Sequence, residues 1–78
     1  MDGKKEKIRA FLLSVIRTSD LQEDDDIFAL GFVDSLFAME LVLFVESEFQ
    51  ITVEKEDLDY ENFKTIKAIT NLVERKMA

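Results

Sequence analysis

The sequence predicts an all-α fold of three main helices and one short helix that comes third along the chain. Three segments place apolar residues at helical spacing. The chain has no proline, which breaks helix interiors. Ile51 and Val53 alternate as a strand would, but two positions without a partner strand are too few for a sheet. With 78 residues, we expect one domain that spans residues 1–78.

The first helix is expected from about Lys4 to Arg17. Its apolar residues follow the offsets i, i+3, i+4, i+7 and i+8, which give a helix one apolar face. These residues are Ile8, Phe11, Leu12, Val15 and Ile16. Charged residues fill the rest of its first half, so the helix is predicted to be amphipathic.

A long connection, residues 18–33, should follow. Residues 18–20 favour turns and should end the first helix. The acidic run from Glu23 to Asp26 is predicted to be solvated, and a short helical turn is expected at Asp26–Leu30. A connection of this length in a small domain is often functional. Its apolar residues should dock onto the helices: Leu21, Ile27, Phe28, Leu30 and Phe32.

The second helix is expected from Ser35 to Phe49. Asp34 and Ser35 are both good N-cap residues, because a side-chain oxygen can accept a hydrogen bond from a free backbone N–H of the first turn. Gly31 just before them allows a tight bend. Helical spacing puts the core face on Ala38, Leu41, Val42, Val45 and Phe49, with Phe37, Phe44 and Glu48 on one flank.

The face of this helix opposite the predicted core is unusually apolar. An ordinary surface helix is polar there, but this one carries three large apolar side chains with carboxylates nearby. The alternative to exposure is that the helix is covered on both sides and these side chains are core. Exposed together, they would form a patch of the kind that marks a binding surface. We therefore predict a partner-binding surface formed by Leu36, Met39, Glu40, Leu43, Glu46 and Ser47.

The remaining third of the chain predicts a loop and two helices. Ile51 and Val53 should point inward from the loop, and residues 56–60 should form the short third helix. Thr65 should cap the last helix, in which Arg75 and Lys76 complement the C-terminal dipole. One face of that helix is apolar at helical spacing: Ile66, Ile69, Leu72 and Val73.

The formal net charge of −7 limits the partners of the chain. Nucleic acid and anionic membrane surfaces would repel it, and partners with basic patches are favoured. The absence of cysteine excludes disulfides and thiolate metal sites. No apolar run approaches the length of about 18 residues that crosses a membrane, and the charged N-terminal segment lacks an apolar signal core. These features lead us to expect a cytoplasmic protein.

Ser35 is the centre of the candidate site. Taken alone, a serine at this place is most often a helix cap, but Asp34 can already fill that role. A phosphate esterified to the Ser35 hydroxyl would be stabilised by the helix dipole and the free N–H groups. A catalytic serine is excluded, since the chain has no histidine to act as base. A lysine base is conceivable, but no glycine-rich oxyanion loop accompanies it, so no catalytic residue is predicted.

The acidic run does not fit a calcium loop. The EF-hand pattern needs an oxygen ligand at position five, glycine at six and glutamate at twelve. Counted from Asp24, these positions hold Phe28, Ala29 and Ser35. No metal site is predicted.

The central motif resembles that of the acyl carrier proteins. It consists of Asp34-Ser35-Leu36 followed by Met39-Glu40-Leu41-Val42, at the start of the second helix of a small acidic chain. The resemblance extends from about Ile8 to Val73. It implies a four-helix bundle with a short third helix, and a 4'-phosphopantetheine arm on Ser35. It also implies that Asp34 helps to hold the magnesium ion used when the arm is attached.

The resemblance further implies a carrier without catalytic activity of its own. The thiol of the arm would carry an acyl group as a thioester to successive enzymes. The expected partners are a phosphopantetheinyl transferase and acyl-loading and acyl-transfer enzymes with apolar docking surfaces and basic rims. We expect no nucleic acid, no insertion into membranes and a monomeric chain.

Two departures from the fatty-acid carriers point to a specialised carrier. Those carriers usually have one residue between glycine and Asp-Ser, where this chain has Phe32 and Val33, and aspartate where it has Phe37. The motif is more similar to free-standing carriers of methoxymalonyl-type polyketide extender units and, next, to D-alanyl carriers. We therefore predict polyketide or other secondary-metabolite biosynthesis, with an aminoacyl carrier as the alternative. An unmodified helical interaction domain and a bundle that binds a ligand in its core are alternatives of other classes.

Overall fold

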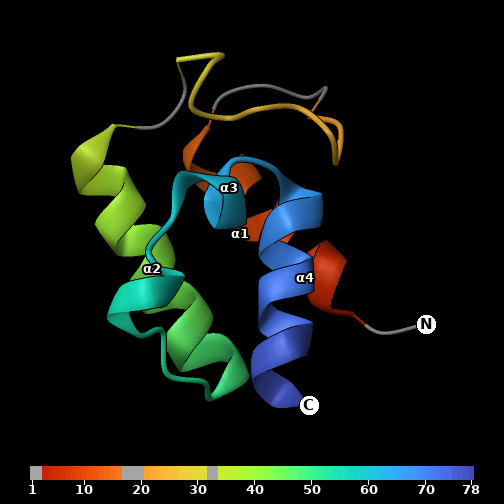
Figure 1. Cartoon of the computed structure of the whole chain (residues 1–78). Coiled ribbons are helices and arrows are strands. Elements are labelled where there is room, and N and C mark those ends of the chain that lie inside the picture. Colours follow the sequence, from red (N-terminus) through yellow and green to blue (C-terminus); the bar gives the residue numbers. More distant parts are fainter. Residues whose placement is uncertain (1–2, 17–20, 32–33) are drawn as a thin grey trace.

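The computed structural model describes residues 3–16, 21–31 and 34–78, and every regular element within these ranges is helical (Figure 1). The prediction of an all-α fold with four α-helices is confirmed. The elements are α1 (Lys4–Val15), α2 (Ser35–Phe49), the 3₁₀ turn η1 (Lys55–Asp57), α3 (Tyr60–Phe63) and α4 (Ile66–Met77). The predictions for Arg17, for residues 18–20 and for Phe32 and Val33 fall outside the described residues.

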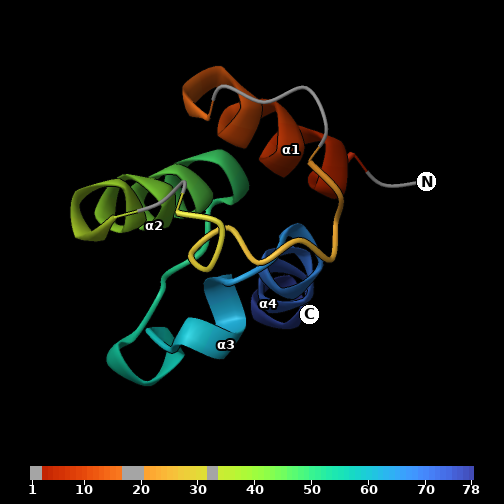
Figure 2. The ribbon, with the colours of Figure 1, turned by 90° about the horizontal axis from the view of Figure 1, so that it is seen from above.

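Helix α4 contacts each of the other three α-helices. The segment 21–31 crosses the end of the bundle at which α2 begins, as Figures 1 and 2 show from two sides. One continuous core joins the helices with this segment and with the segment that follows α2. Its fully buried members include Ile8, Leu12, Ile27, Leu41, Val45, Ile66, Ile69, Leu72 and Val73. The predicted core face of α4 is confirmed, and Ile51 and Val53 pack inward from a loop as expected.

The main helices after α1 begin where cap chemistry predicts. The Asp34 carboxylate accepts a hydrogen bond from the Phe37 N–H at 2.9 Å, and the Thr65 hydroxyl oxygen accepts one from the Ala68 N–H at 2.9 Å. Gly31 has a φ of 80°, in the left-handed region that glycine adopts without strain. The bend before α2 and both caps are therefore consequences of local sequence.

The core face of α2 is rotated from its predicted position. Phe37, which the sequence pattern put on a flank, is buried, whereas Ala38 and Val42 are only half-buried. The reason lies in α1: the Phe11 ring stacks on Phe37 with 5.7 Å between centroids and draws that flank inward. The inner face of α2 consists of Phe37, Leu41, Val45 and Phe49.

Two apolar residues predicted to pack inward are exposed. Val15, the last residue of α1, faces solvent, and Leu13 packs against the core instead. Leu30 is also exposed, while Leu21 and Ile27 from the same connection are buried as predicted. The expected turn at Asp26–Leu30 forms, with a 3.0 Å hydrogen bond from the Leu30 N–H to the Asp26 carbonyl.

The short third helix lies further along the chain than predicted. Residues 56–60 do not form one helix, because η1 ends before Leu58, which is exposed. The Asp59 carboxylate then accepts from the Glu61 N–H and starts α3. Buried Phe63 anchors this single turn to the core.

Candidate functional site

Ser35 is the first residue of α2 and is exposed. Because Asp34 caps the helix, the Ser35 hydroxyl is not needed for that role. The first turn of an α-helix leaves backbone N–H groups without partners in the helix, and these stabilise a nearby anion. The hydroxyl is thus available for chemistry at a position suited to a phosphate.

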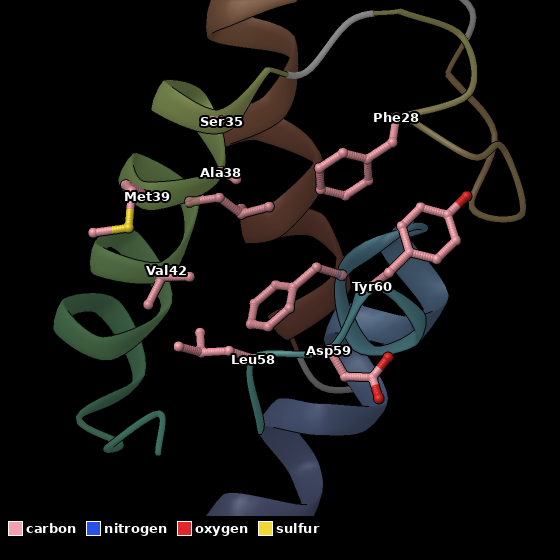
Figure 3. Close-up of a pocket in the computed structure, with 10 residues that line it drawn as sticks. Phe28, Ser35, Ala38, Met39, Val42, Leu58, Asp59 and Tyr60 are labelled. Carbon is pink, nitrogen blue, oxygen red and sulfur yellow. The ribbon is translucent and has the colours of Figure 1, made fainter. Parts of the chain in front are cut away.

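A pocket of about 310 Å³ begins at Ser35 and lies between α2 and the segment from Leu58 to α3 (Figure 3). Met39 and Val42 line it from α2, and Phe28 and Tyr60 line it from the other side. The full lining is Phe28, Ser35, Ala38, Met39, Leu41, Val42, Leu58, Asp59, Tyr60 and Phe63. Most of these side chains are apolar, so the pocket can accept an apolar group joined to Ser35.

A contact between Asp26 and Tyr60 holds the segment 21–31 against α3. The Tyr60 hydroxyl donates a hydrogen bond to the Asp26 carboxylate, and the Phe28 and Tyr60 rings pack 5.5 Å apart at 57°. Asp26 also accepts from the N–H groups of Phe28 and Ala29. The hydrogen bond from Tyr60 is the main cause that lowers the pKa of Asp26, and the same bond raises the pKa of Tyr60.

The sequence predicted that the acidic run is solvated, but Glu23 and Asp26 form contacts within the fold. Besides Asp26, Glu23 forms an ion pair with Lys5 at 2.9 Å, and its carbonyl accepts from the Lys67 N–H. The hydrogen bond from Lys5 lowers the pKa of Glu23. These contacts fix the segment that leads to Ser35. The pairing of Asp26 with Tyr60 could not be predicted from the sequence, because the two residues lie 34 positions apart.

The predicted partner-binding residues mostly gather on one exposed face of α2. Leu36, Met39 and Leu43 are 72%, 61% and 60% exposed, and Glu40 and Ser47 are exposed beside them. We call these five residues the outer face of α2. They are not a second core.

Glu46 differs from the other predicted surface residues. It is half-buried, and its carboxylate accepts a 2.8 Å hydrogen bond from the Val53 N–H. Its side chain therefore ties α2 to the loop that follows. This contact within the chain gives Glu46 a structural role, and binding to another protein is not needed to explain the residue.

The described residues contain no group of three or more histidine, cysteine or carboxylate side chains placed to hold a metal ion. Nor does any helix among them have the length and apolar character needed to cross a membrane. One oxygen of the Asp34 carboxylate serves the helix cap, at the Phe37 N–H. Its second oxygen remains, and Asp34 is the carboxylate residue next to Ser35 in the sequence.

A comparison with protein families identifies the class of this chain. The family model for the phosphopantetheine attachment site matches residues 6–73. The match covers most of the 78 residues, so the chain belongs to this family. It is a carrier protein and not an enzyme, and it carries 4'-phosphopantetheine attached covalently to a serine. A search of curated proteins gives no significant match.

Proposed function

We propose that Ser35 is the serine that carries 4'-phosphopantetheine. The observation that carries this proposal is its place: an exposed hydroxyl at the first residue of α2, free of the capping role and beside an apolar pocket. The phosphate of the arm would lie at the positive end of the α2 dipole. An acyl group would then be carried as a thioester on the thiol of the arm.

The other described serines suit the role less well. The Ser14 hydroxyl, near the end of α1, donates a 2.6 Å hydrogen bond to the Phe11 carbonyl. Ser47 is exposed but lies well inside α2, where the backbone N–H groups are used within the helix. Ser35 alone among these three combines exposure with a helix start.

Asp34 would have two roles at this site. It caps α2 through the Phe37 N–H, and its remaining carboxylate oxygen would help to hold magnesium during attachment. Oxygen ligands suit magnesium, which usually takes one or two carboxylates together with phosphate and water. Coenzyme A and the transferase would supply the other ligands.

The test is the intact mass of the chain after incubation with coenzyme A and a promiscuous phosphopantetheinyl transferase. The wild type should gain one phosphopantetheine, and Ser35→Ala should gain none while its helical circular dichroism is unchanged. Ser14→Ala is the matched control, because Ser14 lies on α1 outside the proposed docking surface, and it should be modified like the wild type. Modification of Ser35→Ala would place the arm on another serine.

We further propose that the cargo belongs to polyketide or other secondary-metabolite biosynthesis, with D-alanyl or another aminoacyl group as the alternative. The motif Gly31-x-x-Asp34-Ser35 supports this specialised class. Phe37 carries less weight as a sign of cargo, because its burial against Phe11 gives it a structural role. Loading assays on the modified chain, with a D-alanine-activating enzyme beside extender-unit donors, would separate the two.

The outer face of α2 is the proposed docking surface for the transferase and the acyl-handling enzymes. Its apolar residues Leu36, Met39 and Leu43 are exposed together, with Glu40 beside them. A complementary partner would present apolar side chains within a basic rim. Such a partner would approach Ser35 directly, because Leu36 is its neighbour.

A further inference from the structure

A second hollow surface lies along the seam between α1 and α2. Two adjoining depressions, of about 420 and 310 Å³, share Phe11, Phe44 and Glu48. Lys7 and Ala10 extend them along α1, and Glu40, Leu43 and Ser47 extend them along α2. We call this surface the α1–α2 groove.

The groove lies on the flank of α2 away from the attachment serine. Phe44 follows Ser35 by nine residues, which is about two and a half turns, so the two side chains point to opposite sides of the helix. The pocket that begins at Ser35 shares no lining residue with either depression of the groove. Leu43, on the outer face of α2, forms the ridge at the groove's edge.

The floor of the groove is a stack of aromatic rings. Phe11 and Phe44 lie 4.2 Å apart between ring centroids and 9° from parallel, and both are only half-buried. Phe44 in turn meets the buried Phe49 edge-on, with 6.2 Å between the centroids. Because the stack is anchored in the core, it is a preformed apolar floor that needs no rearrangement to bind an apolar side chain.

The charges along the groove favour a basic occupant. Glu48 is paired with Lys7 at 3.2 Å, but no cation among the described residues pairs with exposed Glu40. A second copy of the chain would bring a further net charge of −7 to this acidic surface and be repelled. An arginine suits the place better, since it can pair with a carboxylate and stack on an aromatic ring.

We propose that the α1–α2 groove binds a basic amphipathic helix of a partner protein. The apolar side chains along one face of that helix pack on the rings of Phe11 and Phe44 and beside Leu43. A basic residue of the same helix pairs with Glu40. This surface shares Glu40, Leu43 and Ser47 with the outer face of α2 and adds the side of α1 to it, but it shares no residue with the Ser35 pocket. On the proposed roles of Ser35 and of the outer face, such a partner and the transferase therefore compete for the carrier.

The binding test uses the full chain and an amphipathic peptide of about 15 residues, with leucines on one face and arginines beside them. Amide NMR shifts should change most at Ala10, Phe11 and Phe44. Ala10→Arg places bulk and positive charge in the groove from α1 and should weaken binding about tenfold or more. Ala29→Arg adds the same side chain at an exposed turn that does not line the groove and should bind the peptide like the wild type.

Three outcomes overturn the groove as the binding site. They are the absence of peptide binding, shift changes centred on Leu36 and the Ser35 pocket, and equal binding by Ala10→Arg and the wild type. Sedimentation that shows dimers of the chain, broken by Ala10→Arg, would assign the groove to a second copy instead.

The competition with the transferase has its own measurement. With the peptide at saturation, the transferase should add phosphopantetheine more slowly, as followed by intact mass, and Ala10→Arg should relieve this inhibition. A chain that gains no mass even without peptide contradicts the proposed role of Ser35 and leaves the binding result as it stands. An unchanged rate of modification with peptide bound at the groove overturns the competition alone.

Discussion

Helices α2 and α4 are built alike on the inside and differ on the outside. Each begins with a side chain that accepts from a first-turn N–H, and each buries one face in the same core. Opposite its buried face, α4 carries exposed polar residues such as Lys67, Asn71 and Glu74. At the corresponding place α2 exposes Leu36, Met39 and Leu43. Burial in the core explains the apolar face of α4, but it does not explain the exposed apolar side chains of α2, which adjoin Ser35.

The largest expected effect separates the two faces of α2 itself. Leu41→Ala removes a fully buried side chain and should cost about 2–5 kcal/mol of unfolding free energy, because a cavity remains. Leu43→Ala, on the outer face, should change it by no more than about 0.5 kcal/mol and slow acyl loading or transfer. Denaturant melts of the two variants beside a transferase assay decide this. Equal destabilisation by both changes would mean that the outer face is core.

A smaller effect compares the caps of the two helices. Asp34→Ala and Thr65→Ala should each lower the unfolding free energy by about 1 kcal/mol, since each leaves an N–H of the first turn without its partner. Asp34→Ala should also slow the attachment of phosphopantetheine, whereas Thr65→Ala should not. Thermal melts and intact-mass time courses on both variants provide the measurement. Equal modification rates would restrict Asp34 to capping.

A weaker effect concerns the polar end of α4. Lys76 pairs with Asp57 at 2.7 Å, and this hydrogen bond is the main cause that lowers the pKa of the Asp57 carboxyl. Since the pKa of Asp57 is lower in the folded chain than in the unfolded chain, the stabilisation is complete above the unfolded pKa of about 4 and is lost as the pH falls through the folded pKa. The melting temperature of the wild type should therefore fall more steeply below about pH 4 than that of Lys76→Gln. Parallel acid profiles would contradict the pairing.

Salt should have the smallest effect on the stability of the fold. Its main effect should be on the rate at which the chain associates with its partners. Glu40 on the outer face of α2 is exposed and the chain carries a net charge of −7. Association with the transferase should slow as salt shortens the screening length from about 10 Å at 0.1 M to about 3 Å at 1 M. Stopped-flow rates across this range, beside thermal melts, measure both quantities. A rate that does not depend on salt would exclude steering by charge.

The parts of the fold that could be predicted are those with local causes. The bounds of α2 follow from the capping chemistry of Asp34 and the apolar spacing up to Phe49, and the start of α4 follows from Thr65. The exposure of Leu36 and Leu43 follows from the same helical periodicity. No knowledge of the rest of the chain was needed for these features.

The parts that could not be predicted depend on partners far away in sequence. Periodicity gave the existence of a core face on α2, but its rotation toward Phe37 is set by Phe11 on another helix. The sequence pattern predicts Glu46 to be a surface residue. Its carboxylate instead holds the loop after α2, because the Val53 N–H donates a hydrogen bond to it. The contact of Asp26 with Tyr60, which closes one side of the pocket, likewise has no signature in either segment.

The position of Tyr60 has an optical consequence. It is the single tyrosine of a chain without tryptophan, so all ultraviolet-excited phenol emission comes from one wall of the pocket. Its oxygen points away from α2 (Figure 3) and donates a hydrogen bond to the Asp26 carboxylate, while its ring lines the pocket. An acyl chain that enters the pocket beside Ser35 would displace water from that ring and alter the intensity and lifetime of the Tyr60 fluorescence. The fluorescence of the unlabelled protein would therefore report whether such a chain occupies the pocket or lies outside it.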